Sequence, residues 1–205
     1  MTASPTATDY RWFEERFPGL AEAYCITLVR DLSPTDVLAR LGGRTEPART
    51  GVTAMVEASF AHLDRAENSR QFLAMTTVRD WTLLIEPNGC LGVSEESALP
   101  ASAGTRWVSH FVDIEGHEAF LWAEDTVSRV QFEPGTPDHR WGTTPDELLD
   151  AMHDCGFQFW SETSDTAEFL CDKAAFALAE HLTGVRLTPD LLQDTTYVCR
   201  SVKTG

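Results

Sequence analysis

Hydrophobic and polar positions through the middle of the chain follow the pattern of antiparallel strands. Runs rich in β-branched and aromatic residues span 21–31, 72–78, 81–86, 107–114, 117–124, 126–133 and 197–202, and such runs favour strands. Arg79-Asp80 has the length of a tight hairpin, and Pro87-Asn88-Gly89 is typical of a turn. We therefore expect an antiparallel meander sheet of about five to seven strands.

A two-residue turn at Glu115-Gly116 predicts how the strands on either side of it pair. Counting outward from that turn gives three facing pairs: Phe111 with Phe120, Val112 with Ala119, and His110 with Leu121. Both faces of the hairpin are then substantially apolar. This part of the sheet should be covered by helices on both sides.

Helices are predicted where a capping residue, a proline and an apolar stripe follow one another. Ser33 is an N-cap, Pro34 takes the first helical position, and Gly42 ends the helix. The same arrangement recurs at 144–147 and 188–191. Further helices are expected at 9–17, 145–155, 166–183 and 189–193, and residues 52–65 fit a helical stripe approximately.

Strands in a run followed by helices favour an α+β fold with a helical C-terminal third. At 205 residues the chain suits a single domain. We expect a disordered lead-in over residues 1–8 and one α+β domain over 9–205.

The charge balance of the chain is strongly acidic. Sixteen basic residues against thirty-two acidic ones give −16, and residues 105–205 carry eighteen acids against seven bases. Such a field repels nucleic acids and anionic membranes and steers basic partners inward. Solubility alone is the other explanation of the charge. With neither a signal peptide nor an apolar run of about 18 residues, the sequence predicts a cytoplasmic protein.

No sequence motif identifies a catalytic residue, a metal site or a cofactor. The chain has no P-loop, no G-x-G-x-x-G and no G-x-S-x-G. Its five cysteines are widely spaced without C-x-x-C, which indicates neither disulfides nor zinc. The histidines lie at isolated positions, and His110 and His117 are separated along their hairpin. An unfamiliar enzyme stays an alternative, because catalytic residues that converge only in the folded protein are invisible in the sequence.

Acidic residues recur at helical spacing in the last third of the chain. Asp146, Asp150 and Asp154 lie four residues apart, and Glu168 and Asp172 share that spacing on the next predicted helix. Like charges so placed cost a few tenths of a kcal/mol per pair. The stripe is either a docking surface for a cationic partner or a solvated face.

The loop over residues 135–142 concentrates side chains that are common in binding sites. It holds His139, Arg140 and Trp141, which supply an imidazole, a guanidinium and an indole. Trp81 and Glu86 are further candidates for a pocket with this loop. The alternative is that Trp141 fills a core edge while Arg140 pairs with nearby acids, and that Trp81 is core.

Four segments carry a resemblance to a known family. They are residues 10–13, 22–30, 81–89 and 183–188. With these segments in this order, the chain resembles an uncharacterised family of small actinobacterial proteins, a domain of unknown function, over about residues 9–195. Fourteen arginines against two lysines fit a GC-rich genome of that kind. The resemblance implies a single intracellular domain and no particular activity.

These observations favour a non-enzymatic interaction protein of the inhibitor, immunity or regulatory-adaptor type. It would dock a basic partner protein on the acidic stripe, with aromatic residues as anchors. The alternative is a small-molecule-binding protein or unfamiliar enzyme with an aromatic pocket at the sheet and the 135–142 loop. The sequence leaves the oligomeric state open.

Overall fold

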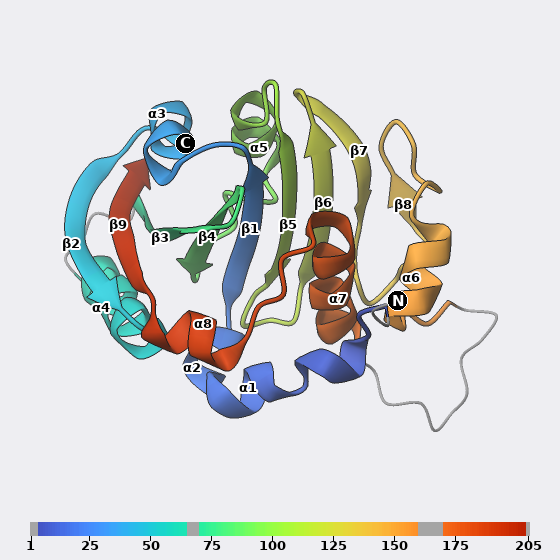
Figure 1. Ribbon diagram of the computed structural model, residues 1–205, viewed down its shortest axis with the longest axis horizontal. Coiled ribbons are helices and arrows are strands. Elements are labelled where there is room, and N and C mark those ends of the chain that lie inside the picture. Colours follow the sequence, from blue (N-terminus) through green and yellow to red (C-terminus); the bar gives the residue numbers. More distant parts are fainter. Residues whose placement is uncertain (1–3, 65–69, 160–169, 204–205) are drawn as a thin grey trace.

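One open antiparallel sheet runs through the part of the chain that the computed structural model describes, residues 4–64, 70–159 and 170–203 (Figure 1). Its nine strands lie in the order β2-β9-β3-β4-β1-β5-β6-β7-β8. This number of strands exceeds the expected five to seven. The strands are β1 Tyr24–Arg30, β2 Arg44–Thr50, β3 Arg70–Val78, β4 Trp81–Pro87, β5 Arg106–Val112, β6 Glu118–Glu124, β7 Val127–Phe132, β8 Arg140–Trp141 and β9 Thr196–Lys203.

Helices lie before and between the strands of this antiparallel sheet, which confirms the α+β class. They are η1 Ala7–Tyr10, α1 Trp12–Arg16, α2 Pro18–Ala21, α3 Pro34–Leu41, α4 Val52–Asp64, α5 Glu95–Ala101, α6 Leu149–Cys155, α7 Cys171–Thr183 and α8 Pro189–Asp194. The last third also contains β8 and β9, so it is only partly helical. Within these described ranges, no helix has the length and apolarity to cross a bilayer.

Each face of the sheet packs against its own set of helices, as the two apolar faces of the meander predicted. One face buries Leu28 and Phe120 together with Phe176 of α7, and the N-terminal helices, α4 and α8 join the same core. The opposite face buries Leu84 against Val37 of α3 and against α5. Figure 1 shows α7 lying across β5 and β6, with the N-terminal helices along the lower end of the sheet.

Two of the three expected helix caps are confirmed. Ser33 Oγ accepts the backbone N–H of Asp36 at 3.2 Å, and the Asp36 carboxylate accepts the N–H of Ser33 at 3.1 Å. Gly42, with φ +74°, ends that helix as expected. Thr188 Oγ1 accepts the N–H of Leu191 at 3.1 Å at the start of α8. Local sequence is sufficient at both sites, because a cap involves only residues three apart.

The third expected cap, at Thr144, is wrong. Helix α6 begins later, at Leu149, and its N-cap residue, Leu148, makes no side-chain cap. Thr144 instead lies beside the sheet: its N–H donates to the Arg129 carbonyl at 3.0 Å, and its hydroxyl accepts from Arg129 Nε at 3.2 Å. The hydroxyl that was expected to cap the helix therefore hydrogen-bonds to a residue of strand β7 instead.

The expected register of the β5–β6 hairpin is also wrong, by one residue. The observed pairs are His110 with Phe120, Phe111 with Ala119, and Val112 with Glu118. The turn is longer than two residues because the Asp113 N–H donates to the His117 carbonyl at 3.0 Å, which leaves three residues in the loop. Gly116 takes φ +81° in that loop, a conformation that glycine adopts without strain. A one-residue shift exchanges the faces, so His110 shares the face of Phe120 and Trp122.

Several elements were not anticipated from the sequence pattern. β2 has the sequence Arg-Thr-Glu-Pro-Ala-Arg-Thr, which is polar because it is an edge strand. β8 is only two residues long, and α5 contains an internal proline. Residues 7 and 8, expected in a disordered lead-in, belong to η1, where Ala7 is buried.

Candidate interaction site

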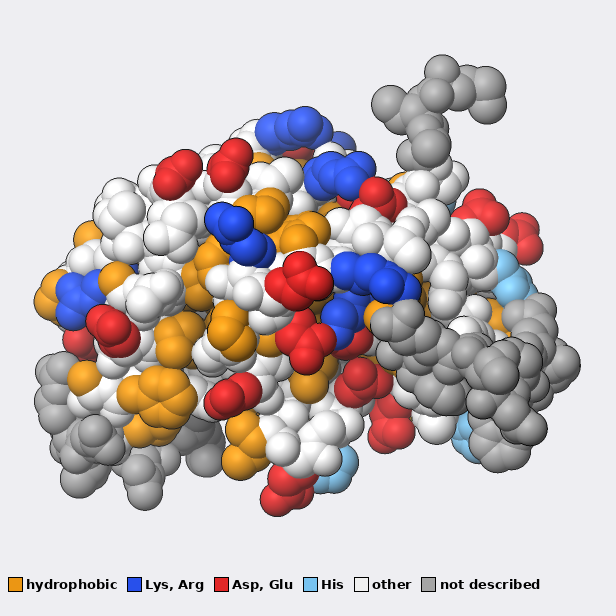
Figure 2. Space-filling model, turned by 90° about the horizontal axis from the view of Figure 1, so that it is seen from below, with side chains coloured by type: hydrophobic (Ala, Val, Ile, Leu, Met, Phe, Trp, Pro, Cys, Tyr) orange, Lys and Arg blue, Asp and Glu red, His pale blue; other side chains and the backbone are white. Residues whose placement is uncertain are grey.

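Carboxylates from distant segments meet at the lower end of the sheet, where β5 turns into β6 and α7 begins. We call this surface the acidic end and define it by Glu14, Glu22, Asp113, Glu115, Glu118, Glu133 and Asp172. Figure 2 views the molecule from below and shows Asp and Glu side chains in a broken band through the middle of the face, with a few basic side chains beside them. Antiparallel topology places these residues together, since β5 and β7 end where β1 and β6 begin.

Lys173 is the cation at the centre of this surface. Its ammonium lies 2.8 Å from an Asp172 carboxylate oxygen and 3.0 Å from Glu14, and its side chain is only 12% exposed. Although burial alone would lower the pKa of this ammonium, its two carboxylate partners raise it above the usual value. A hollow of about 320 Å³ lies beside this pair and is also lined by Glu22.

Glu118 lies in the half-buried part of the surface, where ionisation of its carboxyl is disfavoured. The pKa of this carboxyl is raised to about 7, first by burial and then by the nearby Asp172 carboxylate, whose effect exceeds the opposite effect of Lys173. The backbone N–H of Gly135 donates to Glu118 and acts in the opposite direction. Several carboxylates thus share one well-placed ammonium.

A buried hydroxyl lies behind these carboxylates. Tyr24 is 1% exposed, and its hydroxyl has no hydrogen-bond partner among the residues that the structure describes. Burial raises the pKa of Tyr24, and the negative charges of Asp172 and Glu118 raise it further. The Asp172 and Glu118 carboxylates of the acidic end therefore act electrostatically on Tyr24, a side chain of the core beneath them.

The β5–β6 turn gives the surface a fixed acidic rim. The Asp113 carboxylate accepts the backbone N–H groups of Glu115 and His117, both at 2.9 Å, and lies 2.8 Å from His117 Nδ1. These bonds lower the pKa of Asp113 and raise that of His117, to which Glu115 and Glu133 also contribute. The carboxylates of the turn and of the 133–139 loop are therefore neighbours.

The loop between β7 and β8 holds a second hollow, of about 330 Å³, which we call the Trp141 hollow. It is lined by Glu133, Thr136, His139 and Trp141. The loop is tightly built: the Thr136 N–H donates to the Glu133 carbonyl at 2.9 Å, and the His139 N–H donates to the Thr136 carbonyl at 3.0 Å. The structure therefore brings together His139 and Trp141, two of the candidates for an aromatic pocket.

Arg140, the residue between those two, has a different role from the expected one at a pocket. Its Nη2 donates to Asp146 at 2.8 Å, its Nη1 donates to the Pro137 carbonyl, and its guanidinium lies 5.7 Å from the centre of the Phe159 ring. The side chain is 12% exposed. Arg140 therefore ties the loop to the segment before α6, as the alternative interpretation stated.

The predicted stripe of aspartates is only partly present. Asp146 precedes α6 and is paired with Arg140, so it does not continue the row formed by Asp150 and Asp154, which are exposed on the helix. Asp172 is paired with Lys173 at the start of α7. Glu168 lies outside the described residues. Of the predicted docking residues, Asp172 is the one that the fold places at the acidic end.

Trp81 and Glu86 do not belong to the pocket with which the sequence grouped them. Trp81 is 3% exposed in the main core. Glu86 is fully buried and accepts the N–H groups of Leu91 and Gly92 at 2.9 and 2.8 Å. Burial raises the pKa of Glu86 to about 7. It therefore holds the loop after β4 against the sheet, and alternation along the strand separates it from Trp81.

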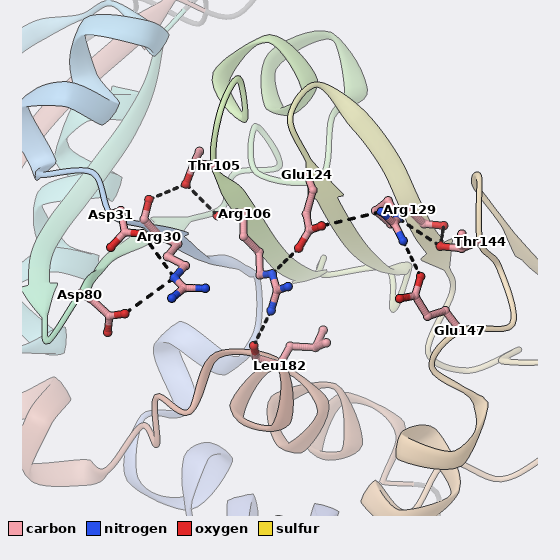
Figure 3. Close-up of polar contacts among 10 residues, drawn as sticks. All are labelled: Arg30, Asp31, Asp80, Thr105, Arg106, Glu124, Arg129, Thr144, Glu147 and Leu182. Atoms are coloured by element: carbon pink, nitrogen blue, oxygen red, sulfur yellow. Dashed lines mark hydrogen bonds and ion pairs between the residues drawn. The ribbon is translucent and has the colours of Figure 1, made fainter.

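The upper end of the sheet carries arginines whose charges are already bound (Figure 3). Arg106 donates to Glu124 at 2.5 Å and to the Leu182 carbonyl at 3.2 Å, which fastens the C-terminal end of α7. Arg129 donates to Glu147 at 2.7 Å. A hollow of about 400 Å³ opens here and is lined by Arg30, Asp31, Gly104, Thr105, Arg106, Glu124 and Asp125. Charges of both signs alternate at this end, whereas carboxylates predominate at the other.

The cysteines are not poised as nucleophiles. Burial raises the pKa of every one of them: Cys25, Cys90, Cys155, Cys171 and Cys199. A reactive thiol needs a lowered pKa, because the thiolate is the nucleophile. Among the described residues, no three His, Cys, Asp or Glu side chains converge in a metal-binding arrangement.

Sequence reasoning missed six members of the site: Glu14, Glu22, Asp113, Glu115, Glu118 and Glu133. Glu118 follows the β5–β6 turn, and Glu133 directly follows β7. An available signal was that successive meander strands place every second turn at the same end of the sheet. The N-terminal helices reach this end only through the tertiary fold.

Comparison with known proteins assigns the family. The chain belongs to a family described as "Family of unknown function (DUF6461)", whose model matches residues 3–205. This confirms the resemblance to an uncharacterised family. No curated protein and no solved structure matches the chain significantly.

Proposed function

We propose that this member of the family is a protein-interaction module that docks a basic partner protein on its acidic end. The observation that carries the proposal is the gathering of carboxylates from the N-terminal helices, the β5–β6 turn, the loop after β7 and the start of α7. Complementary charge speeds association and selects the partner. The activity proposed is binding, of the inhibitor, immunity or adaptor type.

The electrostatics of Glu118 support this proposal. Its raised pKa means that the free protein holds a carboxyl that ionises only against the charge of Asp172 and against burial. A cation brought by a partner would favour ionisation of Glu118. Binding should therefore release a proton, and affinity should rise as the pH increases through about 7.

The cost of the arrangement also supports a binding role. Like charges held close together destabilise a fold, and Lys173 offsets only part of their repulsion. The solubility of a protein needs charge on its surface and does not need it concentrated at one end. A partner whose charge completes the arrangement accounts for the concentration.

The test uses a variant that removes three exposed charges of the acidic end, Glu14→Gln, Glu22→Gln and Glu115→Gln. Wild-type protein at low salt is used to capture partners from the organism that encodes it, and each captured protein is purified. Its dissociation constant is then measured by calorimetry at several salt concentrations. We expect a basic partner whose affinity falls about tenfold in the triple variant and falls steeply with salt.

A matched control removes three charges at the opposite end of the sheet, through Asp31→Asn, Glu95→Gln and Glu96→Gln. Asparagine suits position 31 because Asp31 has φ +52°. The control should bind the partner as the wild type does. Equal losses in the two triple variants would reduce the effect to net charge and reject a localised docking surface, as would a partner that is not basic.

A further inference from the structure

We infer that the Trp141 hollow receives an arginine side chain of the docked partner. The inference rests on the proposed function and names the anchor within it. The hollow lies beside the acidic end, since the Glu133 that lines it also influences His117 and Glu118. Its occupant would be a guanidinium stacked on the indole of Trp141 and paired with the Glu133 carboxylate.

Trp141 presents an aromatic surface that the fold leaves uncovered. It is 45% exposed, whereas Trp81, Trp107 and Trp122 are all nearly buried. It lies on β8, one of the two edge strands of the sheet, opposite Gln131 of β7. A large exposed indole at the side of a hollow is the kind of residue that supplies binding energy at interfaces.

The backbone beside Trp141 is fixed, so the point from which its side chain projects is set before a partner arrives. Gly142 has φ +117°, and a Cβ at this position would lie 2.4 Å from the Arg129 carbonyl oxygen. Only glycine permits this close approach between the loop and β7. On the other side of Trp141, Arg140 is tied to Asp146 and to the Pro137 carbonyl. Little conformational freedom of the backbone would be lost on binding.

The charge around the hollow selects a cation. The Glu133 carboxylate is exposed, and the Thr136 hydroxyl lies 3.4 Å from one of its oxygens. Glu118, whose pKa is raised to about 7, lies close behind it. An anion would be repelled here, and an apolar side chain would bring no positive charge to these carboxylates.

A guanidinium fits this arrangement better than an ammonium. It is planar, so it can stack on the indole while its edge donates to a carboxylate. A lysine ammonium is more strongly hydrated and makes point contacts. At an exposed site, cation–π attraction contributes about 0.5–1 kcal/mol, which corresponds to a difference of roughly two- to fivefold in affinity.

The test titrates N-acetyl-L-arginine amide into the full chain and follows the indole N–H resonances by NMR. The Trp141 resonance is assigned from its loss in Trp141→Phe. We expect a saturable shift of this resonance, affinity weaker by about threefold for N-acetyl-L-lysine amide, and no saturable shift with the neutral N-acetyl-L-citrulline amide. Glu133→Gln should weaken arginine binding, and Glu95→Gln, a distant control, should not.

Three results would overturn the assignment: the absence of a saturable shift with the arginine derivative, an equal response to citrulline, or an unchanged affinity in Glu133→Gln. Equal affinity for lysine would reject the preference for guanidinium. Failure of this inference is distinguishable from failure of the proposed function. If Trp141→Ala and Trp141→Phe bind the captured partner as the wild type does while the acidic-end triple variant binds it weakly, docking stands and the anchor is wrong.

Discussion

Replacing His110 by leucine should stabilise the protein more at pH 5 than at pH 8. The imidazole is 1% exposed, and neither of its nitrogens has a partner among the described residues. It lies edge-on to Phe176 and Tyr24, with ring centres 4.3 and 5.4 Å away. Burial lowers the pKa of His110 to about 3, because an imidazolium in these surroundings would be desolvated and uncompensated.

The sign and size of the effect follow from proton binding. His110 has a lowered pKa in the folded state, so between about pH 3 and pH 6.5 the unfolded chain binds a proton that the folded chain does not. Acidification therefore favours unfolding. At pH 5 the penalty is about 2 kcal/mol, and at pH 8 it is close to zero. Leucine abolishes this penalty and also removes an unpartnered buried polar group, at a cost or gain in packing that does not depend on pH.

The assay is urea-induced unfolding of wild type and His110→Leu at pH 5 and pH 8. The His110 penalty lowers the free energy of unfolding of the wild type at pH 5 and is absent from the variant. From pH 8 to pH 5, the free energy of unfolding should therefore become about 2 kcal/mol more favourable to the folded state in His110→Leu than in the wild type. Groups such as Glu86 that titrate in the same range are present in both proteins and cancel in the comparison. His117→Gln is the control of opposite sign: Asp113 raises the pKa of His117, so His117 contributes stability at low pH that is lost as the pH rises. A pH dependence unchanged by His110→Leu would refute the reasoning.

Three further changes have definite outcomes. A carboxyl whose pKa is raised to about 7, such as Glu86, stabilises the fold below its unfolded pKa and loses that contribution as the pH rises. In the same unfolding assay, the loss of stability between pH 5 and pH 8 should therefore be smaller in Glu86→Gln than in the wild type by roughly 2–3 kcal/mol. Gly142→Ala should lower the melting temperature and cost more than about 1 kcal/mol, because its Cβ would collide with the Arg129 carbonyl; unchanged melting would contradict the close approach. Ser33→Ala should cost about 1 kcal/mol in urea unfolding by removing the acceptor of the Asp36 N–H, whereas Ser33→Asn should retain most of the stability.

Local features of the fold were predictable because they depend on residues close in sequence. The cap at Ser33 and the helix end at Gly42 are set within a few residues, and seven strands were located by their composition. The edge strand β2 escaped because its polar side chains resemble a loop. The register of β5 and β6 was predicted wrongly because the Asp113 side chain makes three hydrogen bonds in the turn. These bonds favour a longer loop than the glycine alone suggests.

The candidate site was harder to predict because it depends on which distant segments meet. Asp146 and Asp172 were singled out by their helical spacing, yet the fold gives each of them a cation, Arg140 and Lys173. Glu133 shows no pattern in the sequence and becomes informative only beside Trp141. The number of charged residues in the sequence shows that the protein is acidic. Which of its carboxylates are neutralised by a cation, and which are not, is decided by the ion pairs of the folded structure.

The two ends of the sheet show why net charge alone is a poor guide to a binding surface. At the upper end, Arg106 and Arg129 are held by Glu124 and Glu147, so a visiting ion would have to displace bonds that already stabilise α7 and the segment before α6. At the acidic end, Lys173 pairs with both Glu14 and Asp172, and the pKa of Glu118 is raised first by burial and then by the Asp172 carboxylate. A partner gains most where it completes an arrangement, because it then adds attraction without breaking an internal pair. This asymmetry, more than the total of −16, is the reason for our proposal that a basic protein docks at the end of the sheet that carries Trp141.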